Sequence, residues 1–290
     1  MDLKVTRYDV ADDGIATLWL SRPGRANSWT GRMHDEYRWI CAKLDNDPAV
    51  RVIVLTGEGD IFCGGADFKA LDHYADTDHY DPALSPDAAR PGYGVRPEFD
   101  ADMAWQLGLR TPMIAAINGS CAGIAVALAA FCDLRFAVED AKITTVAPKI
   151  GLPAEYGLSW ILPRLMGITY AADLLLTGRV ATAGELRHSG LFNRVLPRDG
   201  FLDAVYDYAR LLAAASPAAV STTKRQLWDD ILQASPAAAV EASKKLIGTH
   251  MQLPDYKEGV SAMMQRRAPQ FGPAAGPATS GPATSGPATS

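Results

Sequence analysis

The chain has 290 residues, of which 48% are hydrophobic and 21% charged, so it is long enough to bury a large core as a globular protein. Its net charge of −5 argues against nucleic acid or an anionic membrane surface as a partner, although a few arginines can still bind a phosphorylated ligand locally. The first residues lack the apolar segment of a signal peptide, and no apolar run reaches the ~20 residues of a membrane span.

The four cysteines, Cys41, Cys63, Cys121 and Cys132, have no metal-ligand spacing, and each stands in an apolar neighbourhood. We therefore expect buried free thiols. Free thiols persist in a reducing compartment, which favours a cytoplasmic location.

The N-terminal part of the chain predicts a strand, a polar loop and a helix. Residues 15–20 alternate in polarity as a strand does, and the loop 21–28 carries Arg22 and Arg25. Thr30 can cap a helix over residues 31–45.

A second strand leads into a glycine pair. Residues 50–57 are apolar and β-branched and end in glycine, which predicts a buried strand. The sequence IFCGGADF over residues 61–68 then bends at two adjacent glycines, and residues 66–71 are expected to begin a helix. Free backbone N–H groups at such a bend can bind an anion, or a carbonyl oxygen that becomes one. A tight turn without chemistry explains this segment alone equally well.

The same arrangement recurs further along the chain. Residues 113–117 predict a buried strand, SCAGI over residues 120–124 opens a small-residue helix, and residues 133–137 form the next strand. Two strand–glycine–helix units can aim two N–H groups at one point.

Residues 71–102 contain four prolines and are expected to be irregular, and a helix is predicted over residues 98–110. His73 and His79 lie among aspartates in this stretch. A metal site is the weaker interpretation of that cluster, because surface loops favour the same residue types.

The remaining pattern changes from mixed to helical near residue 200. The predicted elements are a strand at 142–146, a loop at 147–157, helices at 158–162, 168–176 and 182–189, a strand at 192–196, and helices at 201–215, 217–235, 236–250 and 256–266. Gly-Pro-Ala-Thr-Ser repeats from Gly276 cannot support a core, so the tail is expected to be disordered. The predicted organisation is a core at 1–198, a helical subdomain at 199–271 and a tail at 272–290.

The two glycine segments resemble those of the crotonase superfamily, also called the enoyl-CoA hydratase/isomerase family. The resemblance rests on residues 52–57 with 62–67, on 117–119 through 132–135 and on 151–153, and it extends from about residue 5 to 270. It implies an α/β spiral of repeated β-β-α units with a helical C-terminal subdomain that serves as lid and oligomer contact. It also implies an acyl-CoA thioester substrate, coenzyme A as part of that substrate with no permanently bound cofactor or metal, and a homotrimer or homohexamer.

The resemblance carries site residues with it. The backbone N–H groups of Ala66 and Ile124 correspond to the family's oxyanion hole. Positions beside coenzyme A are expected at Arg25, Ala26, Ala66, Asp67 and Phe68, with Arg22 as a charge partner. Each assignment has a purely structural alternative. The two arginines can belong to a solvent-exposed loop without a ligand, and Ile124 can be an ordinary helix start in the core.

The acid–base residues depart from the family pattern. Hydratases use two glutamates, and aligning the glycine motifs places those positions at Ala127 and Ala147, which cannot transfer a proton. Glu155 remains, at a place where related isomerases carry an acidic residue. An apolar setting from Leu152, Pro153, Tyr156 and Leu158 would raise its pKa. Alternatively, Glu155 stabilises the start of the following helix.

Other candidates are weaker. His73, His79, Asp67 and Tyr156 can each reach an acyl chain, and Lys149 is expected to face solvent. The predicted reaction is double-bond isomerisation of an enoyl-CoA, or hydration by one carboxylate and an ordered water. A CoA-ester hydrolase, a C–C lyase and a non-catalytic acyl-CoA-binding protein are the alternatives.

Overall fold

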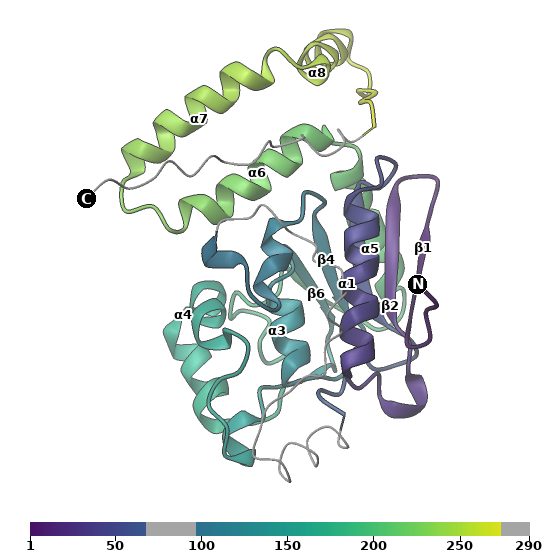
Figure 1. Ribbon diagram of the computed structural model, residues 1–290, viewed down its shortest axis with the longest axis vertical. Coiled ribbons are helices and arrows are strands. Elements are labelled where there is room, and N and C mark those ends of the chain that lie inside the picture. The colour runs from purple at the N-terminus through teal and green to yellow at the C-terminus, as the bar shows by residue number, and fades with distance from the viewer. Residues whose placement is uncertain (68–96, 274–290) are drawn as a thin grey trace, which may run out of the picture.

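The computed structural model describes residues 1–67 and 97–273 (Figure 1). Several predictions concern residues outside these ranges, namely Phe68, His73, His79 and the Gly-Pro-Ala-Thr-Ser repeats. Within them the chain forms two sheets with helices packed around them, which confirms the predicted α/β class.

The larger sheet has six strands and is mostly parallel. In spatial order they are β1 (Thr6–Val10), β2 (Ile15–Leu20), β3 (Val52–Gly57), β4 (Met113–Ile117), β6 (Leu134–Val138) and β9 (Arg194–Leu196). Only the β1–β2 pair is antiparallel within this sheet. Every residue of β3 is buried, as expected for a parallel strand that is covered on both faces.

The smaller sheet has three short strands and carries the second glycine segment. They are β5 (Cys121–Ala122), β7 (Lys142–Thr144) and β8 (Ala181–Thr182), with β5 and β7 parallel. Helix α3 follows β5 directly, so this sheet fixes where that helix begins.

The helices follow most of the predicted boundaries. They are α1 (Gly31–Asp45), α3 (Ile124–Ala130), α4 (Leu158–Thr177), α5 (Phe201–Ala213), α6 (Pro217–Asp230), α7 (Pro236–His250) and α8 (Pro254–Gln265). The Thr30 side chain accepts a hydrogen bond from the Met33 N–H and caps α1, as predicted. Gly167 has φ 72° and ψ 160° and divides α4 into the two helices expected from the sequence.

Two predicted helices are wrong. Residues 98–110 form two short 3-10 helices, Pro97–Phe99 and Ala104–Gly108, because Met103 between them has φ 64° and cannot continue a helix. Thr182 still belongs to β8, and residues 183–189 form turns after it. The Leu186 N–H donates four residues back to Thr182, but the N–H groups of Arg187 and Ser189 donate three residues back, so these bonds form successive turns and not an α-helical ladder.

Helix α5 packs against β2, β3 and β4, whereas α6, α7 and α8 form a layer at one end of the molecule (Figure 1).

Helix α6, which the structure describes in full, buries a single side chain, that of Lys224. Its ammonium group lies 2.7 Å from the Asp133 carboxylate and donates to the Thr111 carbonyl. No helix in the described ranges is long and apolar enough to cross a membrane.

The ends of β3 and β4 are clamped together by the turn that follows β4. The Asn118 side chain donates to the carbonyls of Gly57 (2.9 Å) and Gly59 (2.6 Å) and accepts from the Gly57 N–H (3.2 Å). Gly119 lies so close to the facing turn that a Cβ atom there would be 1.9 Å from the Asp60 carbonyl oxygen. These contacts set the spacing of the two glycine segments.

This close approach predicts a strong effect of Gly119→Ala. The added methyl group clashes with backbone that cannot rotate away, so we expect the free energy of unfolding to fall by at least about 2 kcal/mol. Urea unfolding followed by circular dichroism measures it. Gly248→Ala is the matched control, because that exposed position in α7 has open space around it, and alanine there should stabilise the helix by up to about 1 kcal/mol. A Gly119→Ala protein as stable as the parent would contradict the clamp.

Candidate active site

The two glycine segments lie side by side and run parallel. Cys63 and Cys121 form a parallel bridge in which the Cys63 N–H donates to Ser120 (3.0 Å) and the Cys63 carbonyl accepts from Ala122 (3.1 Å). Two residues further on, a Cβ atom on Gly65 would lie 3.2 Å from the Ala122 carbonyl oxygen, so the segments stay in close contact.

Ala66 and Ile124 each stand three residues beyond this bridge. Ala66 pairs with Trp29 through the flanking residues: the Trp29 N–H donates to Gly65 and the Asp67 N–H donates to Trp29. In such a parallel bridge the N–H of Ala66 itself points away from Trp29. In the described part of the chain neither the Ala66 nor the Ile124 N–H has a hydrogen-bond acceptor. Two amides from adjoining segments are therefore available to a ligand.

The Glu155 carboxylate lies next to the second of these segments. Its Oε2 atom is 3.8 Å from the point that a Cβ atom on Gly123 would occupy, and Val146 Cγ1 lies at the same distance from that point. Gly123 directly precedes Ile124, so the carboxylate stands beside the candidate amide donor. Burial raises the pKa of Glu155 above its ordinary value.

The loop that carries Glu155 is strained and firmly anchored. Val146 has φ 53° and Tyr156 has φ 47°, which are uncommon for bulky residues and are often found at functional sites. The Val146 N–H is held by Thr144 Oγ1 (3.1 Å), and Thr145 Oγ1 donates to the Leu174 carbonyl of α4 (2.8 Å). These contacts anchor the start of the loop that carries Glu155.

Helix α4 begins without a side-chain cap, and its N-cap residue is Gly157. Glu155 accepts the Leu158 N–H through its backbone carbonyl and not through its carboxylate. The carboxylate faces the Gly123 backbone, which weakens the alternative role of helix stabilisation.

The neighbours of Glu155 differ in part from those the sequence suggested. Leu152 and Pro153 are exposed, Tyr156 is half-buried and Leu158 belongs to the core. Lys149 is exposed, as predicted. The two alanines at the hydratase glutamate positions, Ala127 and Ala147, are both buried.

The loop before α1 packs against the first glycine segment through an ion pair. The Arg22 guanidinium lies 3.0 Å from the Asp67 carboxylate, which also accepts from the Ser28 hydroxyl (3.1 Å). Arg22 is therefore the charge partner of Asp67, and the Asp67 side chain is occupied by this pair.

Arg25 and Ala26 lie at the edge of that loop. Arg25 is exposed and has no ion-pair partner among the described residues, so its guanidinium is accessible to a phosphate. The Ala26 carbonyl accepts from the Gly64 N–H (2.8 Å), which brings the loop next to the glycine pair. The structure describes both residues but leaves Phe68, the last expected cofactor neighbour, outside its ranges.

Asn27 is a site-building residue that the sequence reasoning missed. It is fully buried at φ 51°, and its side chain donates to the Glu58 (3.0 Å) and Ile61 (2.7 Å) carbonyls. It joins the Arg25 loop to the turn before the glycine pair. An asparagine in a polar loop is too common a feature to reveal this role.

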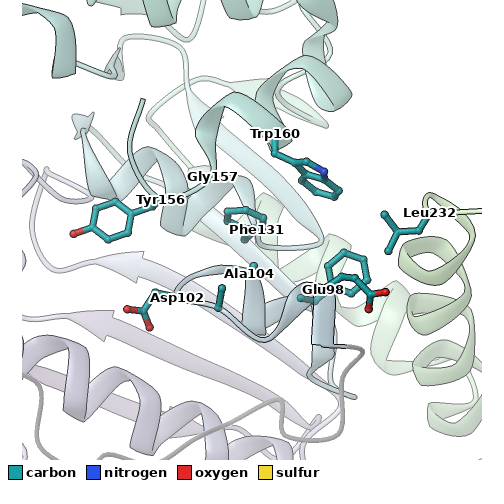
Figure 2. A pocket seen from close by; sticks show the side chains of 10 residues that line it. Glu98, Asp102, Ala104, Phe131, Tyr156, Gly157, Trp160 and Leu232 are labelled. Carbon is teal, nitrogen blue, oxygen red and sulfur yellow. The ribbon is translucent and has the colours of Figure 1, made fainter. Parts of the chain in front are cut away.

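A cavity of about 430 Å³ opens next to the Glu155 loop (Figure 2). Tyr156, Gly157 and Trp160 line one side, Phe131 at the end of α3 lies between them, and Leu232 stands at the far end. The cavity volume suits a small organic group. Among the described residues no cluster of three or more His, Cys, Asp or Glu side chains has the geometry of a metal site.

Comparison with known proteins places the chain among its relatives. Residues 11–274 match the family model for enoyl-CoA hydratase/isomerase. A probable enoyl-CoA hydratase from Mycobacterium bovis is 34% identical over 89% of each chain. The 1,2-epoxyphenylacetyl-CoA isomerase of Escherichia coli is 29% identical over 90% of this chain and 95% of its own.

Solved structures agree with this placement. The crystal structure of a probable enoyl-CoA hydratase/isomerase from Mycobacterium abscessus superposes with a TM-score of 0.79 at 33% identity, over 94% of this chain and 99% of the other. An enoyl-CoA hydratase from Bacillus anthracis gives a TM-score of 0.79 at 26% identity, over 93% of this chain and 99% of the other. The protein therefore belongs to the enoyl-CoA hydratase/isomerase family and has the crotonase fold.

Proposed function

We propose that this family member isomerises the double bond of an enoyl-CoA thioester, with Glu155 as its one acid–base residue. The observation that carries the proposal is the position of the Glu155 carboxylate beside Gly123, next to the candidate amide donor at Ile124. The buried alanines at positions 127 and 147 support it, because they leave no second carboxylate at the places where hydratases carry theirs.

In the proposed reaction the thioester oxygen accepts hydrogen bonds from the Ala66 and Ile124 amides. Glu155 removes a proton from C2 of a 3-enoyl-CoA, and the electron pair moves through the thioester to give a dienolate. The protonated Glu155 then returns the proton at C4, which yields the 2-enoyl-CoA and restores the carboxylate. Each amide donor is expected to stabilise the dienolate by about 3 kcal/mol.

The raised pKa of Glu155 suits both halves of this cycle. A carboxylate in water is a weak base, and burial strengthens it by disfavouring its charged form. Coenzyme A takes part as a portion of the substrate, and the exposed Arg25 guanidinium is positioned to bind its phosphates.

Hydration by Glu155 and one ordered water is the second candidate. Relatives named enoyl-CoA hydratase favour it, and the same amide pair would stabilise its enolate. The products of the two reactions differ in mass, because hydration adds one water to the acyl-CoA, whereas isomerisation adds none.

The test of the function is the Glu155→Gln variant with 2-enoyl- and 3-enoyl-CoA in heavy water. We expect turnover to fall at least ~100-fold, since glutamine keeps the shape but cannot accept a proton, while CoA-ester affinity stays within about twofold. Wild-type enzyme should interconvert the two isomers without adding water, as read by mass spectrometry. Deuterium should enter at C2 or C4 to the extent that the protonated Glu155 exchanges with the heavy water before it returns the proton.

Glu241→Gln in α7 is the matched control, because Glu241 is exposed and, among the described residues, pairs only with Lys244 on its own helix. It should leave turnover unchanged. Full activity of Glu155→Gln would remove Glu155 from the mechanism. A product of the wild-type enzyme that has gained one water would favour hydration. A wild-type protein that binds CoA esters without any turnover would be non-catalytic.

The raised pKa of Glu155 also predicts pH dependence. Its base form is required, so kcat/KM should fall on acidification, with a midpoint above the ~4.3 of an ordinary glutamate. Because the folded protein disfavours the carboxylate, Glu155→Gln should match or exceed the wild-type Tm at pH 7, and this difference should vanish below the unfolded pKa. A variant with a lower Tm at pH 7 would indicate a structural role for the charge. Stopped assays and thermal scans from pH 4 to 8 measure both.

The subunits are proposed to associate as a homotrimer or homohexamer. Large apolar side chains around α4 and the 3-10 helix Ala147–Ile150 are exposed, namely Ile150, Leu152, Ile168, Tyr170, Leu176 and Val180. Their concentration between residues 150 and 180 supports a contact with another protein in this region.

Light scattering after gel filtration should therefore give about three or six times the 31.0 kDa chain mass. Ile168→Asp combined with Leu176→Asp, both more than 70% exposed in the isolated chain, should shift the mass toward a single chain. A wild-type monomer would overturn the assembly proposal.

A further inference from the structure

We infer that the cavity beside Glu155 receives the distal end of the acyl group and that this end is an aromatic ring. The inference rests on the proposed function, because it takes Ala66, Ile124 and Glu155 as the place of the thioester. It adds the chemical class of the substrate, which neither the family nor the fold specifies.

The cavity is walled by aromatic side chains from three separate parts of the chain. Phe99 comes from a 3-10 helix. Phe131 follows α3, Tyr156 lies in the loop before α4, and Trp160 belongs to the first turn of α4 (Figure 2). Phe99 and Trp160 form an edge-to-face pair, with ring centroids 6.2 Å apart and planes at 71°. Rings in this arrangement offer edges and faces to a further ring, and such contacts strengthen binding beyond the apolar area that they bury.

The walls are held in fixed orientations. The Arg164 guanidinium lies 4.0 Å from the centroid of the Trp160 ring and donates to the Trp160 carbonyl, so that one face of the indole is covered. A Cβ atom on Gly157 would lie 3.3 Å from the Phe131 ring, which shows that the α4 start and the α3 end are in close contact. A preorganised aromatic pocket favours a rigid flat group over a flexible chain.

The cavity is tied to the candidate catalytic groups through the chain. Its lining residues Tyr156 and Gly157 directly follow Glu155, and Phe131 directly follows the helix that Ile124 begins. That helix spans about 10 Å, so a ring in the cavity would be joined to a thioester at Ile124 through a spacer of several carbons. The reacting carbons then lie beside Glu155, between the thioester and the ring.

The test measures binding of three saturated acyl-CoAs with equal carbon numbers that end in phenyl, cyclohexyl and straight alkyl groups. By titration calorimetry we expect the phenyl ester to bind about two- to tenfold more tightly than the cyclohexyl ester. Trp160→Leu should abolish that difference, whereas Trp160→Phe should retain most of it. Saturated esters make the result independent of turnover.

The outcomes separate the two proposals. Equal or tighter binding of the alkyl ester, or an equal loss for all three esters in Trp160→Leu, overturns the aromatic inference and leaves the proposed isomerisation standing. A phenyl preference that depends on Trp160, together with no Glu155-dependent turnover of unsaturated esters, upholds the aromatic pocket and overturns the isomerase. If none of the esters binds, both fail.

Discussion

The site depends on one constraint, the close backbone approach between the ends of β3 and β4. Gly119 packs against the Asp60 carbonyl, and Asn118 satisfies both polar groups of Gly57. These contacts keep the two glycine segments adjacent, so that the Cys63–Cys121 bridge can form. The two candidate amide donors, Ala66 and Ile124, each follow their residue of the bridge by three positions.

Around this clamp, separate parts of the chain supply separate functions. The loop before α1 is joined to the first segment by the Arg22–Asp67 ion pair and by Asn27, which leaves Arg25 exposed for a charged ligand. The strained loop after β7 holds the Glu155 carboxylate against the second segment. Backbone geometry therefore provides the oxygen-binding groups, and a single side chain provides the acid–base group.

The elements of the fold that could be predicted are those whose sequence pattern depends on neighbouring residues alone. Strand β2 and helix α1 were predicted with their observed boundaries, because alternation and the Thr30 cap are local features. The helix predicted over residues 182–189 was wrong because its first residue, Thr182, pairs with Lys142 in the smaller sheet, a long-range contact that no local pattern reveals.

The same distinction between local and long-range signals applies to the site. The two glycine motifs led to the predicted amide pair, and the resemblance to the family led to the prediction of Glu155. The aromatic cavity was not predicted, because Phe99, Phe131 and Trp160 come together only through the fold.

The most direct test of the proposed site is a crystal structure with an acyl-CoA thioester bound to Glu155→Gln. We predict that the thioester oxygen lies 2.7–3.1 Å from the backbone nitrogens of both Ala66 and Ile124, the usual range for such donors, and that the side chain of residue 155 lies beside C2. A thioester oxygen that contacts neither amide, or C2 placed away from residue 155, would contradict it.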